Sequence, residues 1–265
     1  MLITLITDFG LSDPFVGMMK GVILSLNSSA GIVDICHQIP AHSIKQAAYQ
    51  WKASYSYFPP GTVHVGVVDP GVGGKRKGIL AVSERYFYIA PDNGLLSLIE
   101  QADPFKAVYE LANPDFQLAD ISHTFHGRDI FAPAAAHLTL GASPLEFGPP
   151  VKEIRRLEFP EPRVTGDRIE GEIIGSDRFG NLFTNIDGSL FFRHFQGTDF
   201  VLSIRDKTVT TFREYYAQRE SPEAFVLINS RGQLEIAFTN DRADRRLGVG
   251  AGDIFVIQPT SRTEF

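Results

Sequence analysis

The sequence contains a single cysteine, Cys36, among its 265 residues. An internal disulfide is therefore excluded, and so is a zinc site built from several cysteine thiolates. No apolar run approaches the roughly 20 residues that a membrane-spanning helix needs. The net charge of −6 argues against a nucleic-acid-binding protein, because such proteins usually carry a basic face. The first residues, MLITLITDFG, lack the charged segment and cleavage site of a secretion signal, so we expect a cytoplasmic protein without a membrane partner.

The first half of the sequence alternates hydrophobic runs with helical stretches. This rhythm predicts an α/β domain over residues 1–150, with a mostly parallel sheet and helices on both faces. The expected strands are residues 2–6, 32–35, 62–68, 79–82 and 86–90. Helices are expected from an N-cap at Asp13 to Leu26, from Ser43 to before Pro59, over a short stretch after Gly94, and from about Asp129 to Leu140.

The character of the sequence changes after Gly148. Prolines and charges over residues 151–166 predict an exposed, extended linker. Short hydrophobic runs separated by glycine turns then predict an all-β, barrel-like domain at residues 167–265. Its expected strands are residues 169–174, 182–186, 200–204, 224–228, 234–238 and 254–257, with a single helix at residues 213–218.

The stretch HVGVVDPGVGGKR at residues 64–76 carries the most chemical information. A Val-rich strand ends at Asp69, because Pro70 removes a backbone donor and favours an extended conformation before it. The carboxylate thus stands at the carboxyl end of a central strand, where open α/β sheets bind their ligands. Arg76 follows seven residues later and can fold back to pair with it. A polar turn closed by a surface ion pair is the plainer alternative.

Three further groups are candidates for a binding site. Asp8 and Asp13 flank the loop after the first strand, where a carboxylate can accept both hydroxyls of a ribose; otherwise they serve as a turn residue and a helix cap. His126 precedes a helix and can face a ligand, or it can be a structural hydrogen-bonding group. The run SDRFGN at residues 176–181 suits a heterocycle and an amine, although a hairpin turn uses the same residues.

Metal binding has little support in the sequence. The seven histidines form no HExxH or HxH pattern. Only His123 and His126 with Asp129 have a spacing compatible with a metal ion, and we expect no metal and no cofactor.

Six motifs occur together in the sequence and in a fixed order. They are TDFG at residues 7–10, VDPGVGG at 68–74, APDNG at 90–94, TFHGRD at 124–129, DRFGNLFTNI at 177–186 and NSRG at 229–232. With them, nearly the whole chain resembles the S-adenosylmethionine hydrolases, also called S-adenosylmethionine hydroxide adenosyltransferases, which are related to bacterial fluorinases and chlorinases. The resemblance implies an α/β domain followed by a β barrel. It also implies a homotrimer that binds S-adenosylmethionine between the N-terminal domain of one subunit and the C-terminal domain of its neighbour.

The resemblance also assigns roles to individual residues. It implies that Asp69, Arg76 and His126 hold the attacking water and that Asp8 binds the ribose hydroxyls. The implied ligands of the methionine amine and carboxylate are Asp13, Asp177, Ser230 and Arg231. The implied adenine-binding residues are Phe179, Asn181 and Phe183. Halogenases carry tyrosine in place of Asp69, and fluorinases carry serine in place of Gly127 and tryptophan in place of Phe183; the first two differences favour water over halide.

The implied reaction forms adenosine and L-methionine by in-line attack of water on C5′ of S-adenosylmethionine. The sulfonium leaves as a neutral thioether, so the reaction requires neither a general acid nor a metal. Asp69 would orient and polarise the water, and Arg76 beside it would weaken Asp69 as a base. Two other classes remain open: a halogenase with the same pocket, and a non-enzymatic protein that binds S-adenosylmethionine or adenosine.

Overall fold

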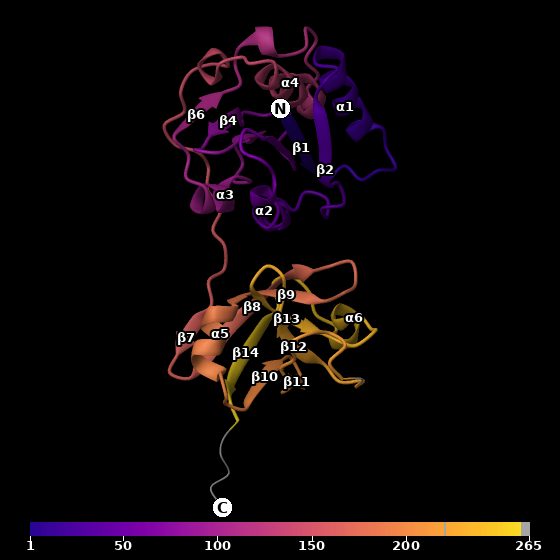
Figure 1. The fold of residues 1–265 in the computed structure, drawn as a ribbon, viewed down its shortest axis with the longest axis vertical. Coiled ribbons are helices and arrows are strands. Elements are labelled where there is room, and N and C mark those ends of the chain that lie inside the picture. Colours follow the sequence, from indigo (N-terminus) through magenta and orange to yellow (C-terminus); the bar gives the residue numbers. More distant parts are fainter. Residues whose placement is uncertain (220, 261–265) are drawn as a thin grey trace, which may run out of the picture. The chain divides into compact units, whose positions relative to one another are not determined.

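The chain forms two compact units in a computed structural model that describes residues 1–219 and 221–260 (Figure 1). The units are Met1–Glu158 and Phe159–Phe265, and each is described by itself below. The last five residues of the domain expected at 167–265 lie outside the described residues.

The N-terminal unit contains a six-stranded sheet in the order β2-β1-β3-β5-β4-β6. Its strands are β1 (Leu2–Thr7), β2 (Gly31–Cys36), β3 (Val63–Val67), β4 (Gly78–Val82), β5 (Phe87–Pro91) and β6 (Ala107–Glu110). The pairs β1–β2, β1–β3 and β3–β5 are parallel, whereas β4 runs antiparallel to both of its neighbours. The expected mostly parallel sheet is confirmed; β6 was not predicted.

Helices cover both faces of this sheet. They are α1 (Phe15–Leu26), α2 (Ile44–Lys52), α3 (Ser97–Ala102) and α4 (Ala132–Thr139). On β3, Val63 and Val65 belong to the core shared with α1 and α4. Successive residues of a strand face opposite sides of the sheet, so the Cα of Gly66 faces the other side. There it lies against the ring of Trp51 on α2. Since β1 and β3 are parallel neighbours, the residues that follow them, Asp8 and Asp69, lie at the same edge of the sheet.

The C-terminal unit is an antiparallel, nearly closed, barrel-like sheet, as expected. The strand order is β11-β10-β14-β8-β9-β13-β12, with β7 paired to β8. The strands are β7 (Arg163–Thr165), β8 (Arg168–Ser176), β9 (Leu182–Asp187), β10 (Phe200–Ile204), β11 (Lys207–Val209), β12 (Phe225–Ile228), β13 (Gln233–Ala237) and β14 (Ile254–Pro259). Its core is rich in isoleucine, leucine and phenylalanine.

The helix expected at residues 213–218 is absent, and this prediction was wrong. The backbone of Arg213 donates to the carbonyl of Val226, and Val226 donates back to Thr211, so the start of the segment is used in pairing with β12. The few residues left form turns, because so short a stretch cannot repay the cost of starting a helix. Two helices that were not predicted occur instead, α5 (Gly188–Phe195) and α6 (Ala243–Leu247).

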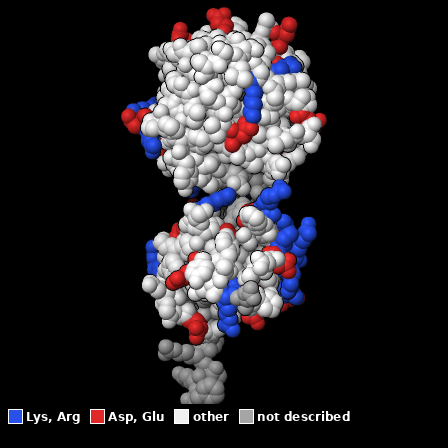
Figure 2. Space-filling model, turned by 45° about the vertical axis from the view of Figure 1, so that its right-hand side comes forward, with Lys and Arg blue, Asp and Glu red and all other residues white. Residues whose placement is uncertain are grey.

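Surface charges of both signs are distributed over the two units. On the face in Figure 2, the N-terminal unit is largely uncharged, while basic and acidic side chains lie side by side on the C-terminal unit. In the C-terminal unit, Arg242 is paired with Asp244 and Arg246 with Asp241. Among the described residues, no helix is both long and apolar enough to cross a membrane.

Candidate functional site

Asp69 and Arg76 form a buried ion pair at the carboxyl end of β3. Their side chains are 4% and 10% exposed, respectively. The Nε of Arg76 donates to Oδ1 of Asp69 at 3.0 Å, and Nη2 donates to Oδ2. Two parallel charge-assisted hydrogen bonds fix both position and plane of the carboxylate. The expectation that Arg76 folds back onto Asp69 is confirmed, and burial distinguishes this pair from the surface ion pair that was its alternative.

His126 joins this pair from a distant part of the sequence. Its Nδ1 lies 2.8 Å from Nη2 of Arg76, the same nitrogen that donates to Asp69. Burial, followed by the positive charge of Arg76, lowers the pKa of His126 below its usual value of 6.5. The ring is therefore neutral at pH 7, and the structure brings the three residues proposed to hold water into one hydrogen-bonded set.

One glycine explains how the two loops come so close. Gly73 has φ of 74°, and a Cβ on it would lie 2.1 Å from the carbonyl oxygen of His123. A side chain at this position would therefore push apart the loop after β3 and the segment before His126. Glycine is needed here both for the positive φ and for the close approach.

Asp8 lies at the same edge of the sheet, on the loop after β1. It is half-buried, and its Oδ2 accepts a hydrogen bond from the backbone nitrogen of His42 at 2.8 Å. The rings of Phe9, Phe15 and Phe125 pack against one another with centroids 5.2–5.7 Å apart, and they hold this loop beside the residue that precedes His126. Asp8 thus lies at the same sheet edge as Asp69, on a loop that packs against the residue before His126.

Asp13 does not cap α1, contrary to the expectation. Pro14 occupies the N-cap position, and the helix has no side-chain cap hydrogen bond. Asp13 is exposed on the loop. A proline at the N-cap position leaves the preceding residue one place too early to reach the first free backbone donors of the helix. Its role in binding an amine is still a prediction.

In the C-terminal unit, the turn Asp177–Asn181 is stabilised by hydrogen bonds between its own residues. Asp177 accepts hydrogen bonds from both the backbone and the side-chain nitrogen of Asn181, at 2.9 and 3.1 Å. Gly180 has φ of 87°, and a Cβ there would collide with Arg242 at 2.7 Å. Phe179 is 74% exposed at the tip of this turn, so its ring is accessible to a planar ligand.

Phe183 differs from Phe179 in its environment. It lies on β9, is only 3% exposed, and has the guanidinium of Arg231 5.1 Å from its ring centroid. Ser230 and Arg231 are exposed on the turn between β12 and β13. The structure therefore brings together Phe183 and Arg231, whereas the accessible aromatic surface belongs to Phe179.

Sequence reasoning missed a buried polar network beneath this turn. Glu235 on β13 is 5% exposed and is hydrogen-bonded to Tyr216 and Asn229. The available signal was a glutamate in the middle of the expected strand 234–238, where all other residues are apolar. A charged residue in a buried strand must have partners; here they are Asn229 on the adjoining turn and Tyr216 on an earlier segment.

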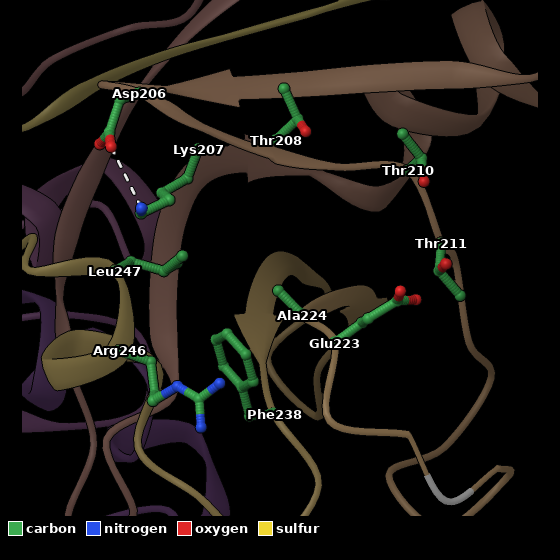
Figure 3. A pocket seen from close by; sticks show the side chains of 10 residues that line it. All are labelled: Asp206, Lys207, Thr208, Thr210, Thr211, Glu223, Ala224, Phe238, Arg246 and Leu247. Atoms are coloured by element: carbon green, nitrogen blue, oxygen red, sulfur yellow. Dashed lines mark ion pairs between the residues drawn. The ribbon is translucent and has the colours of Figure 1, made fainter.

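A separate groove of about 530 Å³ opens on the C-terminal unit (Figure 3). None of the predicted site residues line it. Its two cationic residues are already paired, Lys207 with Asp206 at 3.1 Å and Arg246 with Asp241 at 2.9 Å. We therefore assign no ligand to this groove.

The proposed ligand residues are not arranged as a metal centre. Within residues 1–219 and 221–260, no group of three or more His, Cys, Asp or Glu side chains is placed to hold a metal ion. Asp129, which shares a motif with His126, is fully buried and accepts hydrogen bonds from Arg128 and from the backbone of Ser122. Its carboxylate is thus engaged in fixing the loop that carries His126.

Family models match both halves of the chain. Residues 3–148 match the SAM hydroxide adenosyltransferase N-terminal domain, and residues 171–256 match the C-terminal domain of the same family, SAM being S-adenosylmethionine. The chain belongs to the SAM hydroxide adenosyltransferase family. The resemblance inferred from the six motifs is therefore confirmed.

Relatives of the chain include named enzymes. It is 36% identical to an (R)-S-adenosyl-L-methionine hydrolase from Salinispora tropica over 95% of both chains. It is equally similar to one from Thermus thermophilus, over 93% of this chain and 95% of the relative. A fluorinase from an Actinoplanes species is 27% identical, over 89% and 90% of the two chains.

Solved structures include the same fold. A Thermotoga maritima protein described as an uncharacterized conserved protein is 33% identical, with a TM-score of 0.90 over 97% of this chain and 100% of that one. A conserved hypothetical protein from Thermus thermophilus has a TM-score of 0.76 at 32% identity, over 97% and 99%.

Proposed function

We propose that this protein hydrolyses S-adenosyl-L-methionine to adenosine and L-methionine. The observation that carries the proposal is the hydrogen-bonded set Asp69–Arg76–His126 at the carboxyl edge of the N-terminal sheet. It sits in a chain whose relatives at 33–36% identity are named (R)-S-adenosyl-L-methionine hydrolases. The fluorinases are more distant, at 26–30% identity.

The chemistry requires little beyond a well-placed water. The substrate sulfur already carries a positive charge and leaves as a neutral thioether, so no proton has to be delivered to the leaving group. Water attacks C5′ as the C5′–S bond breaks, and the proton is lost from the water oxygen. Positioning alone can lower such a barrier by several kcal/mol, up to roughly 7–11 in the best cases.

The geometry suits the orientation of that water. Each oxygen of Asp69 accepts from Arg76 but has a second lone pair, with which it can accept from a water molecule. The neutral ring of His126 accepts from Arg76 through Nδ1, so its Nε2–H is available to donate to the water oxygen. Asp69 orients and polarises the water, while Arg76 holds the carboxylate in place.

Substrate binding falls to the remaining predicted residues. Asp8 binds the ribose hydroxyls, as a carboxylate at a strand end does in dinucleotide folds. Phe179, Asn181 and Phe183 contact the adenine. The methionine amine and carboxylate are held by Asp13, Asp177, Ser230 and Arg231. No cofactor or metal takes part.

The proposed assembly is a homotrimer in the cytoplasm. Predicted ligands are divided between residues 8–126 of the N-terminal unit and residues 177–231 of the C-terminal unit. The family resemblance supports a site formed by the N-terminal unit of one subunit and the C-terminal unit of its neighbour. The only small-molecule partner proposed is S-adenosyl-L-methionine.

The test is to incubate the protein with S-adenosyl-L-methionine, with and without chloride, and to separate the products by chromatography. Hydrolysis yields adenosine and methionine in both cases. Formation of 5′-chloroadenosine would instead identify a halogenase, the activity class suggested by the fluorinase relatives. Tight binding without turnover would identify a binding protein and overturn the proposal.

A further inference from the structure

Glu235 is a buried carboxylate that the proposed reaction does not use. It lies on β13 directly opposite Phe183 of β9. The hydroxyl of Tyr216 donates to its Oε1 at 2.6 Å, and Nδ2 of Asn229 donates to its Oε2 at 3.1 Å. Burial raises the pKa of the Glu235 carboxyl above its usual value of 4.5, so the two donors offset only part of a substantial desolvation cost.

The hydrogen bond to Asn229 fixes the orientation of that amide. The Oδ1 of Asn229 accepts from the backbone nitrogens of Arg231 and Gln233, at 2.9 and 3.1 Å. Its NH₂ group must therefore face the opposite way, toward Glu235, and needs an acceptor there. A carboxylate oxygen provides that acceptor.

Asn229 in turn shapes the whole turn between β12 and β13. Its backbone nitrogen donates to the carbonyl of Gln233 at 2.9 Å, and its carbonyl accepts from Gly232 at 2.9 Å. Ser230 and Arg231 lie inside this closed turn. The direction in which they present their polar groups therefore depends on one asparagine side chain and the acceptor behind it.

Charged site residues also lie near Glu235. Asp177 raises the pKa of Glu235, and Arg231 lowers it, through electrostatic interaction in each case. Arg231 covers the ring of Phe183, the residue paired with Glu235 across the two strands. Glu235 thus lies behind the residues proposed to bind the methionine end of the substrate, without being exposed among them.

We infer that Glu235 is a positioning residue: acting through Asn229, it holds Ser230 and Arg231 in the arrangement that binds the substrate carboxylate. This inference rests on the proposed function of the same site. It assigns Glu235 to ground-state binding of the methionine end, so its loss should affect KM for S-adenosyl-L-methionine and leave the reacting centre intact.

The test exchanges donor and acceptor between the two side chains. In Asn229→Asp, the new carboxylate opposes that of Glu235, so the hydrogen bond between the two side chains is lost. Glu235→Gln alone is less informative, because its amide can accept from Asn229 and donate to the hydroxyl of Tyr216. In the double variant Glu235→Gln/Asn229→Asp, an aspartate at 229 still accepts from the backbone of Arg231 and Gln233. It also accepts from the glutamine, which restores every hydrogen bond and the net charge. Glu170→Gln, on a half-buried strand position outside the network, is the matched control.

We expect Asn229→Asp to raise KM for S-adenosyl-L-methionine by about tenfold or more, the effect of one mismatched buried hydrogen bond, with kcat within about twofold. Inhibition by adenosine, which lacks the methionine end, should be unchanged. The double variant should return KM to within about threefold of wild type, and Glu170→Gln should match wild type. If Asn229→Asp does not fold, Glu235→Leu takes its place: it leaves the NH₂ group of Asn229 without its acceptor, so its KM should exceed that of the double variant.

Several outcomes would overturn the inference. One is a normal KM in Asn229→Asp; another is a defect that the double variant does not repair although its melting temperature is normal. A parallel loss of adenosine binding and kcat would show a merely structural role. In these cases the wild type still hydrolyses S-adenosyl-L-methionine, whereas a wild type that neither binds nor hydrolyses it would overturn the proposed function as well.

Discussion

Nδ1 of His126 lies 2.8 Å from Nη2 of Arg76, which also donates to Asp69. An arginine side chain can only donate hydrogen bonds, so Nδ1 of His126 must accept. The imidazole is therefore neutral and carries its proton on Nε2. Carboxylate, guanidinium and imidazole thus have fixed donor and acceptor roles before any ligand arrives.

Replacing Asp69 with asparagine should separate water positioning from substrate binding. The change keeps the size and one acceptor oxygen but removes the negative charge. We expect kcat to fall by roughly 10²–10⁴, the usual range for a positioned acid–base group. Affinity for S-adenosyl-L-methionine should change by about tenfold at most, since one screened charge contributes on the order of 1 kcal/mol. Single-turnover kinetics and calorimetry measure the two effects.

The control for this variant is Glu100→Gln, which breaks a more exposed arginine pair, with Arg156. It should leave kcat unchanged. Melting temperatures of both variants are needed, because Asp69→Asn leaves the buried Arg76 without its charged partner. Normal turnover in Asp69→Asn, or failure caused only by lost binding, would show that Asp69 does not orient the water.

Replacing Asp8 with asparagine should weaken substrate binding more than it lowers kcat, the reverse of what we expect for Asp69→Asn. The new side-chain oxygen can still accept from the backbone of His42, so the loop should keep its shape. The charge-assisted hydrogen bonds to the ribose would be weakened. We expect adenosine and S-adenosyl-L-methionine to bind about tenfold more weakly, with a smaller change in kcat, as measured by calorimetry and steady-state kinetics. Unchanged adenosine affinity would contradict the role of Asp8.

The sequence was informative where structure is determined locally. The strand ending at Asp69 follows from a hydrophobic run stopped by Pro70, and the return of Arg76 spans only seven residues. His126 joins them across 50 residues of sequence. That contact depends on the close approach of Gly73 to the backbone of His123. Only the family resemblance could predict it.

The failures have equally specific causes. The segment 213–218 has helix-compatible residues, but its start pairs with β12 through Val226. Helix propensity depends only on neighbouring residues, so it does not predict pairing with a distant strand. The unpredicted helix α5 did have a local signal, since Asp187 accepts from the backbone of Leu190 as an N-cap. The Glu235 network joins three separate segments, so a glutamate within the apolar strand 234–238 indicates that partners are needed but not which residues they are.

Removal of divalent metals should leave turnover unchanged. The leaving group is neutral, so no Lewis acid is needed to stabilise it. In addition, the carboxylate of Asp129 is engaged by Arg128. Assays after dialysis against a strong chelator test this expectation. A loss of activity that one divalent ion restores would mean that His123, His126 and Asp129 bind a metal after all.

The acid limb of the pH–rate profile should lie below pH 6.5. Burial and Arg76 lower the pKa of His126, while Asp69 and Asp129 oppose this effect and His123 adds to it. The neutral ring is the active form, so kcat should stay constant as the pH falls through 6.5 and decrease only at the lower folded-state pKa. His126 also affects folding stability. Its contribution to the free energy of unfolding is fully present above pH 6.5, the unfolded-state pKa, and is lost as the pH falls through the lower folded-state pKa. Nitrogen NMR of the imidazole should show the proton on Nε2; a midpoint above 6.5 would contradict this assignment.

Mixing two inactive variants should restore activity if each site is formed by two subunits. Asp69→Asn damages only the N-terminal contribution, and Asp177→Asn damages only the C-terminal one. In a randomly mixed cyclic trimer, about one quarter of the sites would combine two intact contributions. Co-expression of the two variants should therefore give about 25% of wild-type turnover, and each variant alone should give almost none.

Two further measurements decide whether such recovery reflects a shared site. Analytical ultracentrifugation should show a trimer, and turnover per subunit should fall when the protein is diluted until the trimer dissociates. Mixing Asp69→Asn with Asp69→Ala is the matched control, since both changes damage the N-terminal contribution and cannot complement each other. If the Asp69→Asn and Asp177→Asn mixture stays inactive, or a monomer retains full activity at nanomolar concentration, each site is contained within one chain.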